Sequence, residues 1–221
     1  MDVLFGDELL LFAFVILLFG CIFGLIVYLA VRQRKKLLEG FTVFAERLGC
    51  PASIPTGFFG GFPSLNGVYR ERTLRVYMFR RASGSGKNRK SKTYTAFTLH
   101  VDNPDGFQFN IYEQGFFSTL LTKFGMQDIL TGDEAFDREF IVKSNNEEKV
   151  RAMLSPPVAA KFMEFAARYT AFGVELKGDQ FYYEAPETIV GEKHMLRFEE
   201  KINFMCDISD RLDEMNRRRR K

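Results

Sequence analysis

Residues 9–31 read LLLFAFVILLFGCIFGLIVYLAV and contain no charged side chain. At about 1.5 Å of rise per residue, a helix of this length crosses the roughly 30 Å hydrocarbon core of a bilayer. A helix is the expected form because it satisfies its own backbone hydrogen bonds inside lipid. The sequence therefore predicts one transmembrane helix, to which the remainder of the chain is attached.

The charges that flank this stretch predict its orientation. Three acidic residues precede it and four basic residues follow it, namely Asp2, Asp7 and Glu8, then Arg32, Arg34, Lys35 and Lys36. By the positive-inside bias, the C-terminal side is cytoplasmic. A cleaved secretory signal would need a basic leading region and a shorter apolar core, which this sequence lacks. We expect a single-pass protein of the inner (plasma) membrane with its N-terminus outside and its C-terminal domain in the cytoplasm.

Gly20 and Gly24 form a small-xxx-small pair within the apolar stretch. Such a pair allows two transmembrane helices to approach closely, so it predicts a homodimer contact through this face. The alternative is an ordinary lipid-facing surface, because glycine is common in transmembrane helices.

The basic residues are concentrated in a few places. Fifteen of the 31 Lys and Arg residues fall in the clusters 32–36, 80–92 and 217–221, which leaves 16 against 28 acidic residues in the rest of the chain. An acidic body with basic patches favours contact with anionic lipid headgroups. The residues predicted to bind the membrane surface are Arg32, Arg34, Lys35, Lys36, Arg80, Arg81, Lys87, Arg89, Lys90 and Lys92. Nucleic acid is not expected as a partner, since aromatic residues do not alternate with these cations.

Residue patterns divide the chain into five parts. We expect a short extracytoplasmic N-terminus (1–8), the transmembrane helix (9–31), a juxtamembrane helix and linker (32–63), a cytosolic domain (64–216) and a disordered basic tail (217–221). In the domain, alternation around Leu74–Phe79 and Phe97–Asp102 predicts two strands, and Phe107–Ile111 a third, joined as an antiparallel meander. The predicted class is α+β, with an antiparallel sheet packed with helices.

The second half of the domain predicts further elements. We expect a short helix over 116–124, a strand carrying Phe136, Phe140 and Val142, and a capping box formed by Ser144 and Glu147. A second helix begins at Ser155-Pro156, a hairpin folds at Gly178-Asp179, and a long amphipathic helix closes the chain.

The order of these motifs resembles an uncharacterised family of bacterial membrane-anchored proteins, a domain of unknown function. The residues that carry the resemblance lie within 64–160 and are Gly67, Tyr69, Thr93, Thr95, Thr98, Gly132, Asp133, Phe136, Asp137, Phe140 and Val142. The last six form a Gly-Asp-x-x-Phe-Asp-x-x-Phe-x-Val element. Glu71 stands where the family usually has glycine, so the first turn is expected to differ. The resemblance implies a shared fold and no activity.

Few residues point to catalysis or cofactors. The run SGSGK (83–87) lacks the glycine spacing of a phosphate-binding loop. His100 has Asp102 on the same strand face, and Asp133 and Asp137 are a candidate acidic pair. Sparse histidines and cysteines give no short-spaced ligand pair, so no metal and no cofactor are expected.

Two functions remain open from the sequence. The first is a non-enzymatic module that binds an unidentified protein partner at the inner leaflet, as an interaction or scaffold domain. The alternative is a membrane-tethered, hydrolase-like enzyme that uses the Asp133/Asp137 region or His100.

Overall fold

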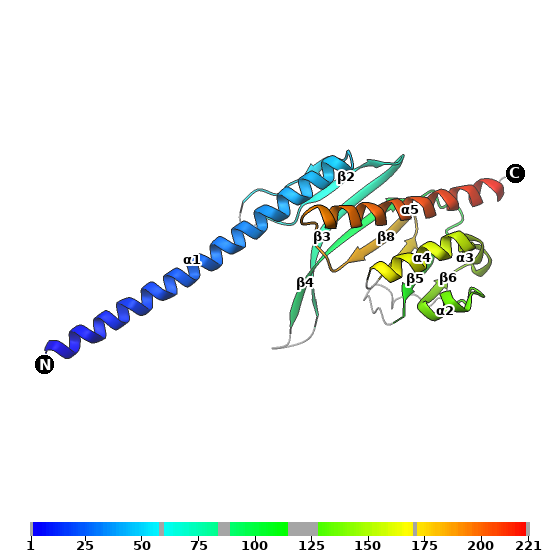
Figure 1. Ribbon diagram of the computed structural model, residues 1–221. Coiled ribbons are helices and arrows are strands. Elements are labelled where there is room, and N and C mark those ends of the chain that lie inside the picture. Colours follow the sequence, from blue (N-terminus) through cyan, green and yellow to red (C-terminus); the bar gives the residue numbers. More distant parts are fainter. Residues whose placement is uncertain (1, 58–59, 84–88, 115–127, 170–171, 220–221) are drawn as a thin grey trace.

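A single helix, α1 (Asp2–Arg47), contains the apolar stretch and continues past it without a break (Figure 1). The structure is a computed structural model of the 221-residue chain, and it describes all residues except 1, 58–59, 84–88, 115–127, 170–171 and 220–221. Within the described residues, α1 is the one helix that is long and apolar enough to cross a membrane. Its side chains from Phe12 to Val31 are exposed, as lipid-facing side chains require.

The last turns of α1 belong to the core of the C-terminal domain. The buried residues there are Phe41, Phe44, Ala45 and Leu48. Arg47 also forms an ion pair with Glu199 of the C-terminal helix α5 (Glu192–Arg219). The predicted division between a 32–63 linker and a domain that begins at residue 64 therefore runs through one packed unit. The apolar residues of this segment recur at helical spacing, which marks one face of a helix but does not tell against which element that face packs,.

A turn at Gly49 ends α1. Its φ of +65° is a left-handed conformation that glycine adopts without strain,. The turn lets the N–H groups of Gly49 and Cys50 donate to the carbonyls of Glu46 and Ala45, which would otherwise lack partners at the helix end,.

The eight strands form one antiparallel sheet. They are β1 (Ala52–Ser53), β2 (Ser64–Tyr69), β3 (Arg72–Ser83), β4 (Lys90–His100), β5 (Phe109–Glu113), β6 (Phe140–Ser144), β7 (Gly173–Lys177) and β8 (Gln180–Ala185). Their order across the sheet is β1-β2-β3-β4-β8-β7-β5-β6. The α+β class with an antiparallel sheet is thus confirmed.

The predicted meander is wrong at its third strand. β5 pairs with β6 and β7, and the β7–β8 hairpin inserts between β4 and β5. β8 pairs with β4 in a register that places Phe97 opposite Tyr183, with ring centroids 4.8 Å apart. Local alternation marks a strand and its faces, whereas the choice of neighbour depends on residues far away in the chain.

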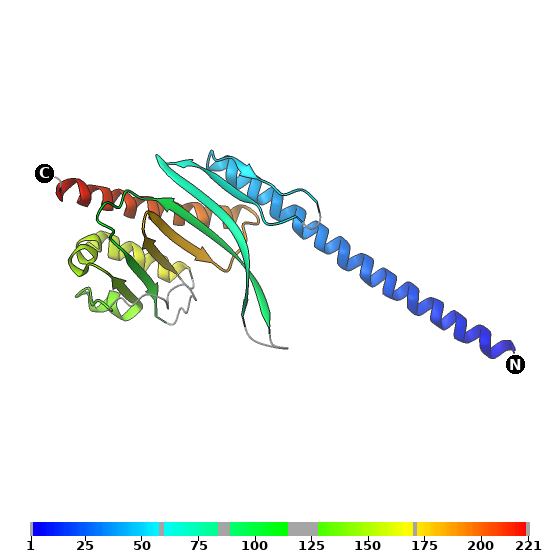
Figure 2. The same ribbon diagram turned by 180° about the vertical axis from the view of Figure 1, so that it is seen from behind.

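Helices cover one face of this sheet. Figure 1 shows α5 and α4 (Pro156–Arg168) in front of the strands with the end of α1 beside them, and Figure 2 shows the strands in front of α5. The core between the two layers is rich in aromatic rings. Phe204 of α5 stacks on Phe165 of α4 at 4.5 Å and meets Phe162 edge-on at 5.0 Å. Close ring pairs of this kind add to the burial of apolar area.

Two local predictions in the 131–147 region are wrong. Residues Glu134–Glu139 form a short helix, α2, and the strand begins only at Phe140. The N-cap of α3 (Glu147–Met153) is Asn146, whose Oδ1 accepts from the N–H of Lys149 at 2.9 Å. Ser144 instead donates its hydroxyl to the carbonyl of Gln108 at 2.8 Å, which ties β6 to the segment before β5.

The ends of two other predicted elements can be placed. α5 continues to Arg219, so residues 217–219 of the predicted tail are helical. The helix expected over 116–124 lies outside the described residues. The hairpin at Gly178-Asp179 and the helix start at Ser155-Pro156 are confirmed.

Gly40 lies where α1 meets the loop before α5. A Cβ at this position would stand 2.9 Å from the carbonyl oxygen of Ile189 and 3.5 Å from the backbone nitrogen of Gly191. Ile189 is fully buried, so this loop has little room to retreat. The glycine therefore permits close approach of α1 to the loop before α5.

We expect Gly40→Ala to destabilise the domain. In a free helix this change is favourable by roughly 1 kcal/mol, but here the added methyl group meets a backbone carbonyl. The expected net loss of unfolding free energy is about 1–2 kcal/mol, measured by thermal unfolding of the full chain in detergent. The matched control is Gly24→Ala, whose Cβ would meet nothing within 4 Å. A higher melting temperature for Gly40→Ala would contradict this account.

Candidate functional site

The cations that follow the apolar stretch are connected in space to the sheet domain. Arg34 of α1 donates its Nη2 to the carbonyl of Gly61 at 3.5 Å. The next residue, Phe62, has the guanidinium of Arg80 over its ring at 5.9 Å. Cations from α1 and from strand β3 therefore lie on either side of one loop, although they are more than forty residues apart in sequence.

The remaining predicted cations are exposed or lie outside the described residues. Arg32, Lys35 and Lys36 are exposed on α1, and Lys35 forms an exposed ion pair with Glu39 at 3.7 Å. Arg80, Arg89, Lys90 and Lys92 are exposed near the end of the β3–β4 hairpin. Lys87 is outside the described residues. We use the name basic surface for the group Arg32, Arg34, Lys36, Arg80, Arg89, Lys90 and Lys92.

Arg81 already has a carboxylate partner within the fold, so its binding to a membrane surface stays a prediction. Its guanidinium makes two parallel hydrogen bonds to Glu184 of β8, Nη1 to Oε1 at 2.6 Å and Nη2 to Oε2 at 2.7 Å. The Tyr182 hydroxyl donates to the same carboxylate at 2.6 Å. The hydrogen bonds to Glu184 raise the pKa of Arg81, and burial together with Glu184 raises the pKa of Tyr182. The Glu184 side chain is 5% exposed, so its carboxylate exchanges contact with water for hydrogen bonds to this arginine and tyrosine,.

The acidic pair Asp133 and Asp137 has local structural partners. Asp133 is the N-cap of α2, and its Oδ1 accepts from the N–H groups of Ala135 and Phe136 at 3.0 and 3.2 Å. The Asp137 carboxylate accepts from the N–H and hydroxyl of Thr131, both at 2.8 Å, and from the N–H of Gly132 at 3.1 Å. These contacts fix the loop that leads into α2.

His100 lies far from that pair. Its Nδ1 is 3.2 Å from Asp179 in the β7–β8 turn, and its side chain is half exposed. His100 is in β4, whereas α2 precedes β6, and β8, β7 and β5 lie between the two strands. At about 4.8 Å per strand, the imidazole and the Asp133/Asp137 carboxylates cannot act on one bond.

Two other predictions concern sites that the fold leaves open. A Cβ at Gly20 or Gly24 would meet nothing within 4 Å, so this face of α1 is free, and dimerisation through it stays a prediction. Across the described residues, no group of three or more His, Cys, Asp and Glu side chains is arranged to hold a metal ion.

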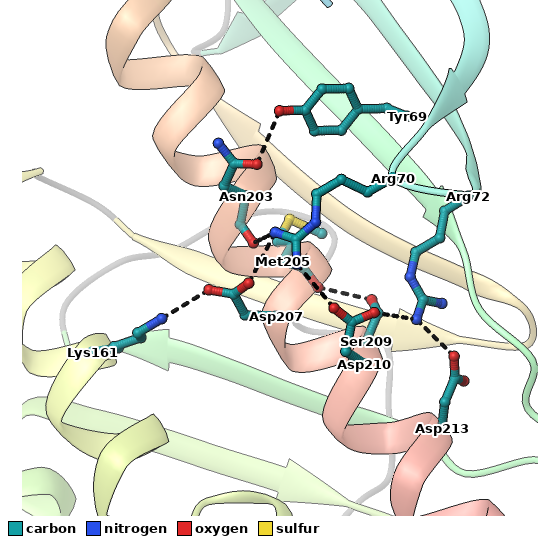
Figure 3. Close-up of polar contacts among 10 residues, drawn as sticks. All are labelled: Tyr69, Arg70, Arg72, Lys161, Asn203, Met205, Asp207, Ser209, Asp210 and Asp213. Carbon is teal, nitrogen blue, oxygen red and sulfur yellow. Dashed lines mark hydrogen bonds and ion pairs between the residues drawn. The ribbon is translucent and has the colours of Figure 1, made fainter.

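The densest charged cluster was not predicted from the sequence. Figure 3 shows the β2–β3 turn clamped onto α5, with Arg70 and Arg72 facing Asp207, Asp210 and Asp213. Its ion pairs are Arg70–Asp207 at 2.9 Å, Arg70–Asp210 at 2.9 Å, Arg72–Asp210 at 2.7 Å, Arg72–Asp213 at 2.6 Å and Lys161–Asp207 at 2.8 Å. The Tyr69 hydroxyl adds a hydrogen bond to Asn203 at 3.0 Å. We call this group the α5 clamp.

The turn in this clamp is conformationally unusual. Arg70 and Glu71 have φ of +48° and +64°, the left-handed values of a two-residue hairpin that normally holds Asn or Gly,. The ion pairs of Arg70 help to hold it in this conformation. Burial raises the pKa of Asp207, but the hydrogen bonds from Lys161 and Arg70 outweigh it, and the net pKa lies below the usual value. A signal existed in the sequence, because acidic residues at 207, 210 and 213 share one helical face.

A buried lysine lies elsewhere on α5. Lys201 is 1% exposed, and its Nζ lies over the rings of Tyr169, Tyr183 and Phe198 at 4.4, 5.0 and 5.2 Å. Burial lowers its pKa to about 8, and the carboxylate of Glu187 opposes part of that change. The rings stabilise the cation in a site that excludes water.

Comparison with known proteins gives a likeness of fold. No protein-family model matches the chain, and no curated protein matches it. The crystal structure of the mycobacterial trehalose monomycolate transport factor A, TtfA, is similar with a TM-score of 0.53 and 10% sequence identity. The match covers 80% of this chain and 94% of that one. At this identity the likeness shows a shared fold. The resemblance to bacterial membrane-anchored proteins stays a prediction.

Arg72→Met should destabilise the domain more than Arg70→Met. Arg72 is 11% exposed, so its removal leaves Asp213 half-buried without its cation, at an expected cost of about 2 kcal/mol,. The partners of Arg70 are 40–51% exposed, and solvent screening limits its contribution to less than about 1 kcal/mol,. Chemical unfolding of both variants tests this. The double variant Arg72→Met/Asp213→Asn should recover part of the loss, and equal losses in the two single variants would refute the distinction.

Lys201→Met should stabilise the domain at pH 7 by about 1–2 kcal/mol, because it removes a charge that burial disfavours. The pKa of Lys201 is about 8 when folded and about 10.4 when unfolded, so the folded state loses this proton first,. Wild-type stability should rise between those pH values, and the advantage of the variant should shrink there. The exposed Lys193→Met is the control. If Lys201→Met were less stable than the wild type at every pH, the contacts of the ammonium group with the three rings would outweigh the cost of removing that group from water.

Proposed function

We propose that this chain is a single-pass membrane protein whose α+β domain works in the cytoplasm, at the inner leaflet, as an interaction or scaffold module. The observation that carries the proposal is the continuity of α1 from the apolar stretch into the domain core. Phe41, whose side chain is the first of α1 to be buried in that core, lies ten positions after Val31. A helix of this length rises about 15 Å, so the domain stands close to the bilayer.

A rigid connection suits presentation to a membrane neighbour. A flexible linker would let the domain sample many distances and orientations, whereas a continuous helix fixes both relative to the span. The four cations directly after Val31 support the cytoplasmic placement of the domain,. Burial of Cys50 and Cys206 as free thiols is compatible with a reducing compartment,.

The fold likeness adds modest support for an accessory role. The similar solved protein, TtfA, is named as a transport factor. By analogy, we propose that this chain is an accessory component of an envelope complex, with a protein partner in or near the same membrane. The substrate in the name of that protein is not transferred, because a fold supports many functions.

The geometry favours this module over the enzyme alternative. Asp133 and Asp137 bind backbone and hydroxyl groups of their own loop, and three strands lie between the strand of His100 and the strand that follows this loop. Residues that would have to act together in a hydrolase-like site are therefore dispersed.

Labelling of Lys193→Cys tests the topology on which the proposal depends. Lys193 is exposed at the start of α5, whereas Cys50 and Cys206 are buried and Cys21 lies in the apolar stretch. A charged, membrane-impermeant maleimide should label the variant only after the cells are permeabilised. The wild-type chain, treated identically, is the control for the native thiols. Labelling in intact cells would place the domain outside and overturn the proposal.

A further inference from the structure

The β3–β4 hairpin extends toward the membrane side of the domain. In Figures 1 and 2 it projects past the rest of the sheet, on the side where the N-terminal half of α1 leaves the domain. The Arg34–Gly61 and Phe62–Arg80 contacts connect the base of this projection to the juxtamembrane turns of α1. The hairpin is long because β3 and β4 pair over ten residues each, from Leu74–Leu99 to Ser83–Lys90.

Charge is distributed unequally over the molecule. The cations of the α5 clamp are neutralised by aspartates, and Arg81 is neutralised by Glu184. By contrast, Arg80, Arg89, Lys90 and Lys92 form no ion pair with any carboxylate in the described part of the chain. Unpaired cations therefore remain where the hairpin points toward the bilayer, on a body whose other charges are mostly acidic.

The hairpin also has aromatic side chains and a hollow suited to an interface. Phe79 and Tyr94 stack across the two strands at 5.5 Å, and both are half-buried. Tyr94 and Arg81 line an open depression of about 520 Å³ together with Lys90, Ser91 and Lys92. Tyr94 supplies an apolar ring, and Lys90 and Lys92 supply positive charge in the same depression. This combination of residues is found at the level of lipid headgroups.

We propose that this hairpin docks on the anionic phospholipid headgroups of the membrane that α1 crosses. Arg80, Arg89, Lys90 and Lys92 supply the charge, and phosphate groups occupy the depression beside Tyr94. The length of a transmembrane helix does not set its tilt in the bilayer, which depends on its contacts at the membrane surface. A second contact through the hairpin therefore fixes the orientation of the domain relative to the membrane. The inference rests on α1 spanning the membrane, as in the proposed function, and names lipid as a partner of the domain itself.

Fluorescence quenching in nanodiscs tests the contact directly. The full chain carries Cys21→Ser and Ser91→Cys, with an environment-sensitive fluorophore at position 91. Discs contain phosphatidylcholine alone or phosphatidylcholine mixed with phosphatidylglycerol, each with a headgroup spin-labelled lipid as quencher. Quenching should be strong in the anionic discs, weaker in the neutral discs, and reduced by high salt. A fluorophore placed by Glu148→Cys on α3, at the far end of the domain, should stay unquenched in both (Figure 1).

Removal of the charges should release the hairpin. Each cation near an anionic surface changes the ratio of docked to undocked hairpin by about fivefold. The triple variant Arg89→Gln/Lys90→Gln/Lys92→Gln should therefore lower this ratio about one hundredfold in anionic discs. The control is Arg138→Gln/Arg217→Gln/Arg218→Gln, which removes three exposed cations from α2 and the end of α5.

Three outcomes would overturn the inference. Position 91 could remain unquenched in anionic discs, quenching could be equal in neutral and anionic discs, or the triple variant could quench like its control. The first would leave the hairpin free for an acidic protein partner, and the others would mean that charge does not drive the contact. Both leaflets of a disc have the same composition, so these results do not depend on which side of a cell membrane the domain occupies. Failure here therefore differs from failure of the topology labelling.

Discussion

The burial of Phe41, Phe44 and Leu48 in the core of the α+β domain is the constraint on which the structure depends. Phe41 and Phe44 lie on the same continuous helix as the apolar stretch, and Leu48 lies in the turn that ends it, so the apolar helix and the domain are one mechanical unit. The close approach at Gly40 and the ion pair between Arg47 and α5 secure the junction from two sides. Any rotation or tilt of the apolar stretch must be transmitted to the sheet, because α1 continues without a break from that stretch into the domain core.

The charged side chains fall into two groups, those that form ion pairs within the fold and those that remain exposed without one in the described part of the chain. The aspartates along α5 are satisfied by Arg70, Arg72 and Lys161, and this clamp holds a strained two-residue turn against the helix. The hairpin cations have no such partners in the described part of the chain. Opposite charges thus pair within the fold, whereas the cations of the hairpin stay exposed, and we propose that they face a surface of opposite sign.

The likeness to TtfA shows how loosely this architecture is tied to sequence. One residue in ten is identical, yet the match spans 80% of the chain. A sheet with one face covered by helices needs apolar residues at the right period and little else, so many sequences can adopt it. Function must therefore be argued from features of this chain itself, such as the basic surface.

By itself, the sequence determined the features that need no distant partner. A helix long and apolar enough to cross a membrane follows from composition alone, and the hairpin at Gly178-Asp179 and the amphipathic α5 follow from local turn chemistry and periodicity. Phe136 and Phe140 show the limit, since a spacing of four fits one face of a helix and one face of a strand equally well. Only the tertiary structure decided that α2 is helical, that β8 lies beside β4, and that Glu184 neutralises Arg81. Each of these depends on contacts that become favourable only when remote segments exclude water together, which no local pattern records.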